Sequence, residues 1–315
     1  VMEKSGVNFG TSGVRGRVVA LSDEVCWAYA VGFIQYLQET KQLQSGATVG
    51  IAGDYRTSTD RMMGVLSQAI VDQGFEPVNL GKIPSPALAL YGLKHNMPTM
   101  MVTGSHIPED RNGIKFNTAL GEILKPDEQG IRAQVITIPD RKFTLDGTLV
   151  REPTLPVLDG TAKAEYVKRY LNFFPKNALS GLSLGLYEHS SVSRECLYEI
   201  LIGLGAKVMC LGRSDVFISV DTEAIRPEDI VLAAQWSNEH HFDCIISTDG
   251  DGDRPLLSDE KGVWLRGDVA GVLCAQYLDA DAVITPVNGN SALELSGLFS
   301  YTQRTQIGSP YVIAG

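Results

Sequence analysis

The sequence contains no apolar run of about 18 residues, the length that a membrane-spanning helix needs. Its first residues also lack the basic stretch followed by an apolar stretch that is typical of a secretory signal peptide. These two absences predict a cytoplasmic protein that has no membrane partner.

An excess of basic residues is absent as well. The chain has 27 lysines and arginines against 37 aspartates and glutamates, which gives a formal net charge of -10. Nucleic acids and anionic membrane surfaces require basic patches, so this balance argues against both as partners. It leaves a phosphate-bearing substrate open, because a few arginines can reverse the local field inside a cleft.

The sequence also has no pair of cysteines at C-x-x-C spacing. Its five cysteines are odd in number and widely scattered, which favours reduced, buried thiols over a disulfide framework. The 315 residues are 44% hydrophobic and 20% charged, an ordinary globular composition. A chain of this length predicts two or three domains.

Strand-like and helix-like segments alternate along most of the chain. This β-α-β order predicts an α/β fold of consecutive layered domains with mixed, largely parallel sheets. The segments expected to be helical are 23–38, 59–73, 85–95, 193–204, 230–239, 267–278 and 291–299. Those expected to be strands are 48–52, 77–80, 99–103, 182–187, 207–211, 242–247, 282–286 and 311–313.

The periodicity breaks down between residues 125 and 155, where prolines and charged residues predict a linker. We therefore expect an N-terminal α/β domain over 1–150, a second α/β domain over 151–260 and a third over 261–315. An apolar strand at the very end would lack covering elements, so we expect the third domain to be incomplete.

The sharpest chemical motif is Thr248-Asp-Gly-Asp-Gly-Asp-Arg254. Its three carboxylates, Asp249, Asp251 and Asp253, are separated only by glycines, which permit the backbone conformations that convergence on one cation requires. Magnesium prefers a few carboxylates together with water or phosphate oxygens. The spacing therefore predicts a magnesium site.

Two other types of site share features of this motif. An EF-hand calcium loop also begins D-x-D-x-D, but its sixth position should be glycine and is Arg254 here, after a strand and not a helix. A solvated acidic turn without a cation would suffer repulsion among three close carboxylates. Both are less consistent with the sequence than the magnesium site.

A second motif is Gly104-Ser-His-Ile-Pro, which follows the strand expected over 99–103. A serine where a strand meets a loop is a natural nucleophile position, and His106 or Lys115 could handle its proton. Pro108 argues against the G-x-S-x-G elbow of hydrolases, because it prevents an immediate helix. Taken alone, a serine such as Ser105 is more often a hydroxyl that shapes a turn than a nucleophile.

Two further segments could bind phosphate. Gly10-Thr-Ser-Gly-Val-Arg-Gly16 offers backbone N–H groups, hydroxyls of Thr11 and Ser12, and Arg15. Asp54-Tyr-Arg-Thr-Ser places Arg56 where a strand ends and a helix begins, a position that favours anions. A mobile arm and simple helix capping are the alternatives for these two segments.

The order of these four motifs along the chain closely resembles the α-D-phosphohexomutase family, from Phe9 to about Val312. The resemblance implies that Ser105 carries a phosphoryl group and that Asp249, Asp251 and Asp253 hold Mg²⁺ together with an oxygen of that phosphate. It implies Lys115 as general acid or base, and Arg15 and Arg254 as residues of the site.

The resemblance also implies an activity: interconversion of hexose 6-phosphate and hexose 1-phosphate through phospho-Ser105 and a hexose 1,6-bisphosphate intermediate. Ile107 replaces the family's usual asparagine, and this Ser-His-Ile-Pro variant favours phosphomannomutase activity over phosphoglucomutase or phosphoglucosamine mutase activity. The resemblance also implies four domains, with a sugar-recognition loop in the third, beyond Val312, and a substrate-phosphate loop in the fourth. We therefore expect both loops and the fourth domain to be absent here. A catalytically silent sugar-phosphate or cation-binding protein is therefore the alternative, and we expect a monomer or weak homodimer.

Overall fold

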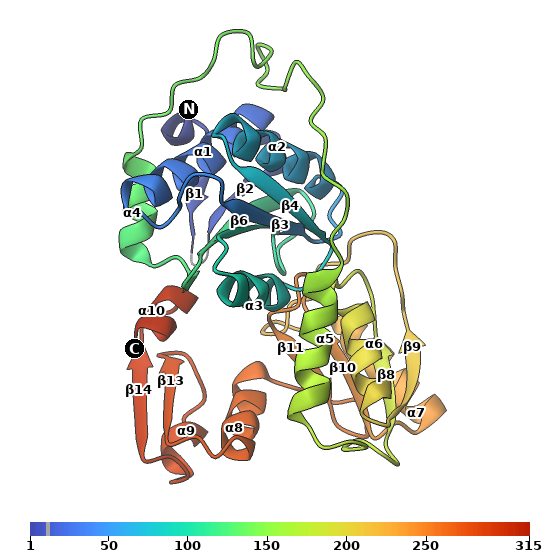
Figure 1. The fold of residues 1–315 in the computed structure, drawn as a ribbon. Coiled ribbons are helices and arrows are strands. Elements are labelled where there is room, and N and C mark those ends of the chain that lie inside the picture. The colour runs from blue at the N-terminus through green and yellow to red at the C-terminus, as the bar shows by residue number, and fades with distance from the viewer. Residues whose placement is uncertain (11–12) are drawn as a thin grey trace.

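The computed structural model describes residues 1–10 and 13–315. Within these residues the strands form three separate sheets, which follow one another along the chain. Figure 1 shows the N-terminal part above, the second part to the lower right and the C-terminal part to the lower left. The mixed α/β architecture expected from the sequence is confirmed. The exact domain boundaries remain predictions.

The first sheet has the order β1-β2-β6-β5-β3-β4, with β7 paired to β6. β3, β4 and β5 are parallel, whereas β6 runs antiparallel to β5 and β2. The strands are β1 (Asn8–Phe9), β2 (Val14–Arg17), β3 (Thr48–Gly53), β4 (Glu76–Gly81), β5 (Thr99–Val102), β6 (Arg111–Thr118) and β7 (Gly121–Glu122).

Helices cover both faces of this sheet. α1 (Asp23–Glu39), α2 (Thr59–Asp72) and α4 (Lys125–Ala133) supply the larger core, whose fully buried side chains include Trp27, Phe33 and Phe116. On the opposite face α3 (Ser85–His95) packs with α5 (Thr161–Phe173) over a smaller core. Short 3₁₀ helices lie at Met2–Lys4 (η1) and Val18–Ala20 (η2). The segments that follow the carboxyl ends of β3 and β5 contact the second domain, since Arg56 packs on Phe217 and Ser105 bonds to Asp249.

The second sheet has the order β12-β11-β10-β8-β9. β8 (Ser183–Tyr187) lies between and parallel to β9 (Lys207–Leu211) and β10 (Cys244–Thr248), while β11 (Pro255–Ser258) and β12 (Trp264–Leu265) continue the sheet antiparallel. Two apolar clusters cover its faces, one with α5 and α6 (Arg194–Gly203) and the other with α7 (Pro227–His240).

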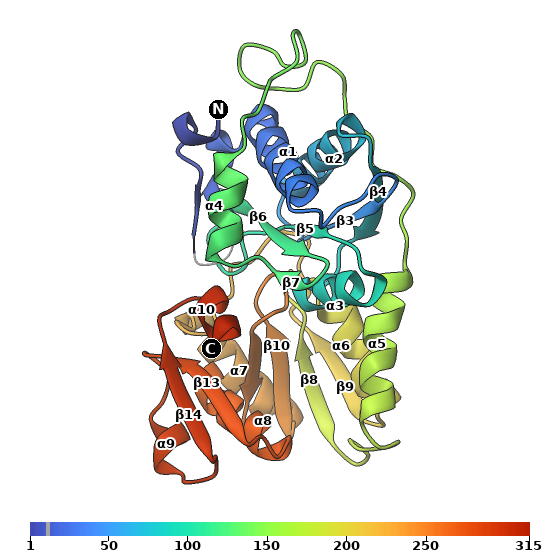
Figure 2. The ribbon, with the colours of Figure 1, turned by 60° about the vertical axis from the view of Figure 1, so that its left-hand side comes forward.

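The C-terminal part contains a parallel pair, β13 (Ala282–Pro286) and β14 (Tyr301–Thr305). Its helices are α8 (Gly267–Tyr277), α9 (Ala292–Leu295) and α10 (Ser309–Ala314). Figure 2 shows α10 between this pair and the first sheet. There Ser309 Oγ lies 2.8 Å from Glu122 Oε1, which ties α10 to β7.

Several sequence predictions of secondary structure are wrong. Residues 311–313 belong to helix α10 and not to a strand, because Ser309-Pro310 begins a helix there. The predicted linker over 125–155 begins with helix α4, in which Pro126 occupies the first turn, a position where a proline needs no N–H partner. The helix expected over 291–299 is reduced to α9, and β14 was not predicted.

No helix among the described residues combines the length and the apolar character that crossing a membrane would take.

Candidate active site

The acidic loop joins β10 to β11, so a strand precedes it and the EF-hand interpretation is wrong. Asp249 Oδ1 accepts hydrogen bonds from the backbone N–H groups of Gly252 and Arg254, at 3.1 and 3.3 Å. Gly252 has φ +76°, and a Cβ there would lie 1.9 Å from Ser193 Oγ. The loop is thus closed by its own first carboxylate and requires glycine at its tip.

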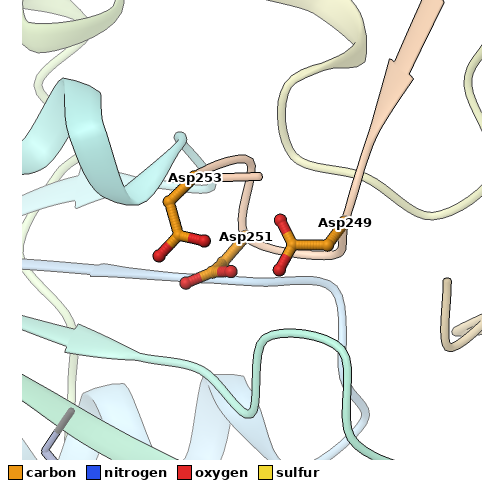
Figure 3. A group of neighbouring side chains, drawn as sticks. All are labelled: Asp249, Asp251 and Asp253. Atoms are coloured by element: carbon orange, nitrogen blue, oxygen red, sulfur yellow. The ribbon is translucent and has the colours of Figure 1, made fainter. Parts of the chain in front are cut away.

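The three carboxylates predicted to bind a cation converge. One carboxylate oxygen from each of Asp249, Asp251 and Asp253 lies within 4.8 Å of the others, and Figure 3 shows the three side chains gathered along one loop. Asp249 and Asp251 are fully buried. Asp251 Oδ1 is also buried, and no described residue donates a hydrogen bond to it.

Lys115 joins this cluster from β6. Its Nζ lies 2.7 Å from Asp251 Oδ2 and 2.5 Å from Asp253 Oδ2. Burial alone would lower the pKa of Lys115, but the two carboxylates outweigh burial and raise it above its ordinary value. The structure therefore holds Lys115 as an ammonium ion between two aspartates.

The two buried aspartates titrate in opposite directions. Burial, reinforced by repulsion from Asp251 and Asp253, raises the pKa of Asp249 well above its ordinary value. Burial acts the same way on Asp251, but the charge of Lys115 overcomes it and lowers that pKa. Lys115 thus compensates Asp251 more than it does Asp249, and a cation beside Asp249 would relieve the remaining repulsion.

Ser85 also contacts the acidic loop, and the sequence analysis did not identify it. Its Oγ donates to Asp251 Oδ2 at 2.6 Å, and its backbone N–H donates to Asp251 O at 2.8 Å. Ser85 is the first residue of α3 and follows Pro84. A serine between two prolines at a helix start is the signal that could have marked it, because backbone and hydroxyl donors there point outward.

Ser105 lies in the loop between β5 and β6. Its Oγ donates to Asp249 Oδ2 at 2.5 Å, and His106 Nδ1 lies 3.3 Å from Ser105 Oγ. Ser105 has φ +55°, a left-handed conformation that is uncommon outside glycine. Thr103 Oγ1 accepts from the Ser105 N–H at 2.8 Å and donates to Asp54 Oδ2 at 2.8 Å. The predicted nucleophile and the predicted metal ligands therefore meet.

The second domain also contacts His106. Ser219 Oγ donates to the His106 carbonyl, and Asp221 Oδ2 lies 4.0 Å from His106 Nε2. Burial, followed by the positive charge of Arg254, lowers the pKa of His106 below its ordinary value. His106 is thus neutral at pH 7 and able to accept a proton.

A cleft of about 950 Å³ opens beside this cluster. Arg15, Lys115, Asp253 and Arg254 line it, and so does Ser309 from the C-terminal part. Burial lowers the pKa of Arg15, against the attraction of the nearby aspartates. Ser105, Asp249 and Asp251 do not line the cleft, so Lys115 and Asp253 connect it to these buried groups.

The predicted phosphate ligands differ in whether they line the cleft. Arg56 does not line the cleft, and hydrogen bonds within the protein engage all five of its N–H groups, which argues against its assignment as a phosphate ligand. Arg15 and Arg254 do reach the cleft. Thr11 and Ser12 lie outside the described residues.

The donor set fits a hard divalent cation. Three carboxylates offer oxygens within reach of one ion, and one buried oxygen, Asp251 Oδ1, accepts no hydrogen bond from the described residues. The candidate ligands among the described residues are carboxylate oxygens, which suit magnesium or calcium better than softer metals.

Two family models match the chain. The model described as phosphoglucomutase/phosphomannomutase, alpha/beta/alpha domain I, matches residues 6–142, and that for domain II matches residues 164–262. The residues matched by the first model include Ser105 and Lys115, and those matched by the second include the acidic loop. The cluster is therefore assembled across the two matched domains.

Comparison with individual proteins gives a consistent result. The chain is 44% identical over 311 residues to a phosphomannomutase of Sinorhizobium fredii, with 98% of this chain and 64% of that protein covered. It is 43% identical to a phosphomannomutase of Salmonella muenchen, with 100% and 63% covered. This chain thus spans a little under two thirds of the length of either relative.

Among solved structures, a putative phosphomannomutase of Thermus thermophilus superposes with a TM-score of 0.80. The two chains are 21% identical, and the superposition covers 97% of this chain and 70% of the other. At that identity the likeness shows a shared fold and no more.

Proposed function

The chain belongs to the phosphoglucomutase/phosphomannomutase family, the α-D-phosphohexomutases, and we propose that it carries the phosphoryl-transfer centre of a phosphohexomutase. The observation that carries this proposal is the 2.5 Å contact between Ser105 Oγ and Asp249 Oδ2 inside a cluster of three aspartates. A serine that only shaped a turn would not need to contact a buried cluster of three carboxylates.

Ser105 is the proposed carrier of the phosphoryl group. In the transfer step the bond between the Ser105 oxygen and phosphorus breaks, and a bond between a substrate hydroxyl oxygen and phosphorus forms. The hydroxyl proton passes to His106, which is neutral and whose Nδ1 lies 3.3 Å from Ser105 Oγ, and His106 passes a proton to the departing Ser105 oxygen. Hexose 1,6-bisphosphate is the proposed product of this step, and its other phosphoryl group returns to Ser105 in the reverse reaction.

Charge neutralisation is the main task of the surrounding residues, because phosphoryl transfer needs positioning and electrostatic stabilisation more than covalent chemistry. Lys115 is held as an ammonium at the boundary between the buried cluster and the cleft. It would provide positive charge and, in the return step, a proton. Arg15 and Arg254 line the cleft and would bind the phosphate oxygens of the substrate.

Mg²⁺ is the proposed ion of the aspartate cluster, held by Asp249, Asp251 and Asp253 and by an oxygen of phospho-Ser105. When bound, it supplies Lewis-acid stabilisation of charge on the phosphoryl oxygens and on the departing serine oxygen. The preference for Mg²⁺ over Ca²⁺ rests on the family and on the small number of protein ligands.

Mannose phosphate is the proposed substrate, because the two relatives reported above, at 44% and 43% identity, are named phosphomannomutases. Glucose and glucosamine phosphates are the alternatives within the family. The chain is shorter than those relatives, so both the activity and the choice of sugar are proposals for the protein of which these residues form part. A cytoplasmic location and a monomeric or weakly dimeric state remain predictions from the sequence.

The test is to incubate the chain with hexose 1,6-bisphosphate and Mg²⁺ and to measure the intact mass. One added phosphoryl group, mapped to Ser105 and absent from Ser105→Ala, is the expected result. Ser300→Ala, an exposed serine of the C-terminal part, is the matched control and should be labelled like the parent. Mg²⁺ binding without any adduct would favour the silent cation-binding protein instead. Rates with mannose, glucose and glucosamine phosphates then rank the sugars.

A further inference from the structure

Arg56 follows β3, and its side chain is fully buried, with a relative exposure of 0%. Its Nε donates to Asp54 Oδ2 at 3.1 Å. The other four N–H groups donate to backbone carbonyls of the segment that contains the nucleophile. These acceptors are Ser105 O at 2.9 Å, Ile107 O at 2.6 Å, Pro108 O at 2.8 Å and Arg111 O at 3.1 Å.

This pattern differs from that of an arginine poised for a ligand. A guanidinium has five N–H donors in a fixed planar fork, and Arg56 uses all five within the protein. Binding a phosphate would require it to release these carbonyls, among them the buried Ser105 O, which would then lack this partner. The guanidinium is therefore built to hold the 105–111 backbone.

The segment it holds needs support. Ser105 adopts φ +55°, and a non-glycine residue persists in that region only where the surrounding structure fixes it. At the preceding residue, Gly104, a Cβ would lie 2.7 Å from Arg56 Cζ. The guanidinium thus packs directly against the backbone that turns Ser105 toward Asp249.

The second domain covers the other face of Arg56. The Phe217 ring centroid lies 3.9 Å from Arg56 Cζ, a close cation–π contact. Phe217 also borders the acidic loop, since a Cβ added at Gly250 would lie 3.0 Å from the Phe217 ring and 2.8 Å from Ser105 O. Ring, guanidinium, serine loop and acidic loop therefore pack as one unit across two domains.

We propose that Arg56 is a positioning residue, which fixes the left-handed backbone of Ser105 so that Oγ points at Asp249, and that Phe217 locks it in place. The inference rests on the proposed function, in which Ser105 carries the phosphoryl group. Arg56 itself touches neither substrate nor the transferred phosphoryl group.

The first experiment compares Arg56→Lys with Arg61→Lys. Lysine keeps the charge but cannot present five donors in a plane. Arg61 lies on the surface of the same domain, where it pairs with Asp23 and donates to Leu21 O at 2.8 Å. Single-turnover phosphorylation of Ser105 by hexose 1,6-bisphosphate gives a maximum rate and a half-saturating concentration for each variant.

For Arg56→Lys we expect a maximum rate reduced about 100-fold, the usual consequence of misplacing a reacting atom by about 1 Å. The half-saturating concentration should stay within a factor of about three, because substrate groups in the cleft are untouched. Arg61→Lys should change neither value. If Arg56→Lys keeps the parent's maximum rate but needs a higher half-saturating concentration, Arg56 is a phosphate ligand and the proposal is overturned.

The second experiment measures backbone hydrogen exchange, which does not depend on phosphoryl transfer. In Arg56→Lys, exchange over residues 104–111 should become faster, while exchange in α2 should match the parent. If the parent takes up no phosphoryl group, the proposed function fails, and this measurement still decides the positioning role. Unchanged exchange over 104–111 would overturn it.

If Arg56→Lys does not fold, Phe217→Leu provides the equivalent test. It removes the ring from the guanidinium but leaves all five hydrogen bonds of Arg56. We expect a smaller rise in exchange over 104–111 and a smaller fall in the maximum rate. Parent-like values of both would contradict the proposed lock.

Discussion

Ser105 Oγ lies 2.5 Å from Asp249 Oδ2, although 144 positions separate the two residues in the sequence. The serine belongs to a loop of the first sheet, and the aspartate follows a strand of the second. Their contact places a hydroxyl against a buried carboxylate cluster where two domains meet. It is the geometry from which the proposed chemistry follows.

Asp249→Asn should weaken Mg²⁺ binding. Asparagine keeps an oxygen that can accept from the Gly252 and Arg254 N–H groups, so the loop should keep its shape, but one negative charge is lost. Because ligand charge tunes cation affinity over several decades, we expect a loss of about 100-fold, measured by isothermal titration calorimetry. Asp279→Asn, at an exposed left-handed position that asparagine tolerates, should bind Mg²⁺ like the parent. Equal affinity in Asp249→Asn would remove Asp249 from the proposed ligands.

Lys115→Met should destabilise the protein when no divalent ion is added. It leaves Asp251, which is fully buried, without its principal counter-charge. Breaking such a pair costs about 3 kcal/mol or more, to be measured by urea denaturation. Combining Lys115→Met with Asp251→Asn should cost less than the sum of the single changes. Lys261→Met, at an exposed position, is the control. An additive double variant would mean that the pair is not coupled.

Ser85→Ala should loosen the acidic loop. The lost hydrogen bond runs from Ser85 Oγ to a charged oxygen of Asp251, and such bonds contribute about 2 kcal/mol. Denaturation and Mg²⁺ titration should both show the loss. Ser85→Thr retains the hydroxyl and should stay close to the parent, so equal effects of the two substitutions would refute this role for the hydroxyl.

His189 should make stability depend on pH. It is fully buried, its Nε2 lies 2.8 Å from the Thr248 carbonyl, and burial lowers its pKa from 6.5 to about 4. Between these values the unfolded state binds a proton that the folded state does not. Stability therefore falls as the pH falls from about 6.5 to 4, by about 3 kcal/mol from this group.

His189→Gln isolates that contribution, because glutamine can still donate to the Thr248 carbonyl but does not titrate. Its loss of stability between pH 6.5 and 4 should be smaller than that of the parent, as followed by denaturant unfolding at each pH. His240→Gln, at an exposed position, should retain the parent's dependence. Parallel curves for His189→Gln and the parent would contradict the assignment.

The sequence predicted the βα alternation well but failed where polar residues are buried. β6 carries Asn112, Lys115 and Asn117 in its buried interior, so no apolar alternation marked it as a strand. α5 was missed because only Ala162 and Val167 are buried along it. The apolar Tyr311-Val-Ile segment resembled a strand, yet Pro310 in the first turn begins a helix there.

Some residues of the candidate site could be predicted from motifs, whereas others are revealed only by tertiary contacts. Ser105, Lys115 and the three aspartates were named from motifs, and the structure brings them together. Arg56 was assigned to phosphate, whereas it binds backbone carbonyls of the serine loop. Ser85, Phe217 and Ser219 were missed, because each acts only on a segment that is remote in the sequence.

The sequence by itself indicated the acidic loop, since three carboxylates alternating with glycines within five residues can converge on one cation when glycine permits a tight turn. Only the tertiary structure decided that the Ser105 hydroxyl contacts Asp249 and that the Lys115 ammonium lies between Asp251 and Asp253. It also decided that Arg56 donates to the backbone of the serine loop. Those contacts join segments from different sheets. Their geometry depends on how two hydrophobic cores pack beside one another, and local spacing carries no information about that packing.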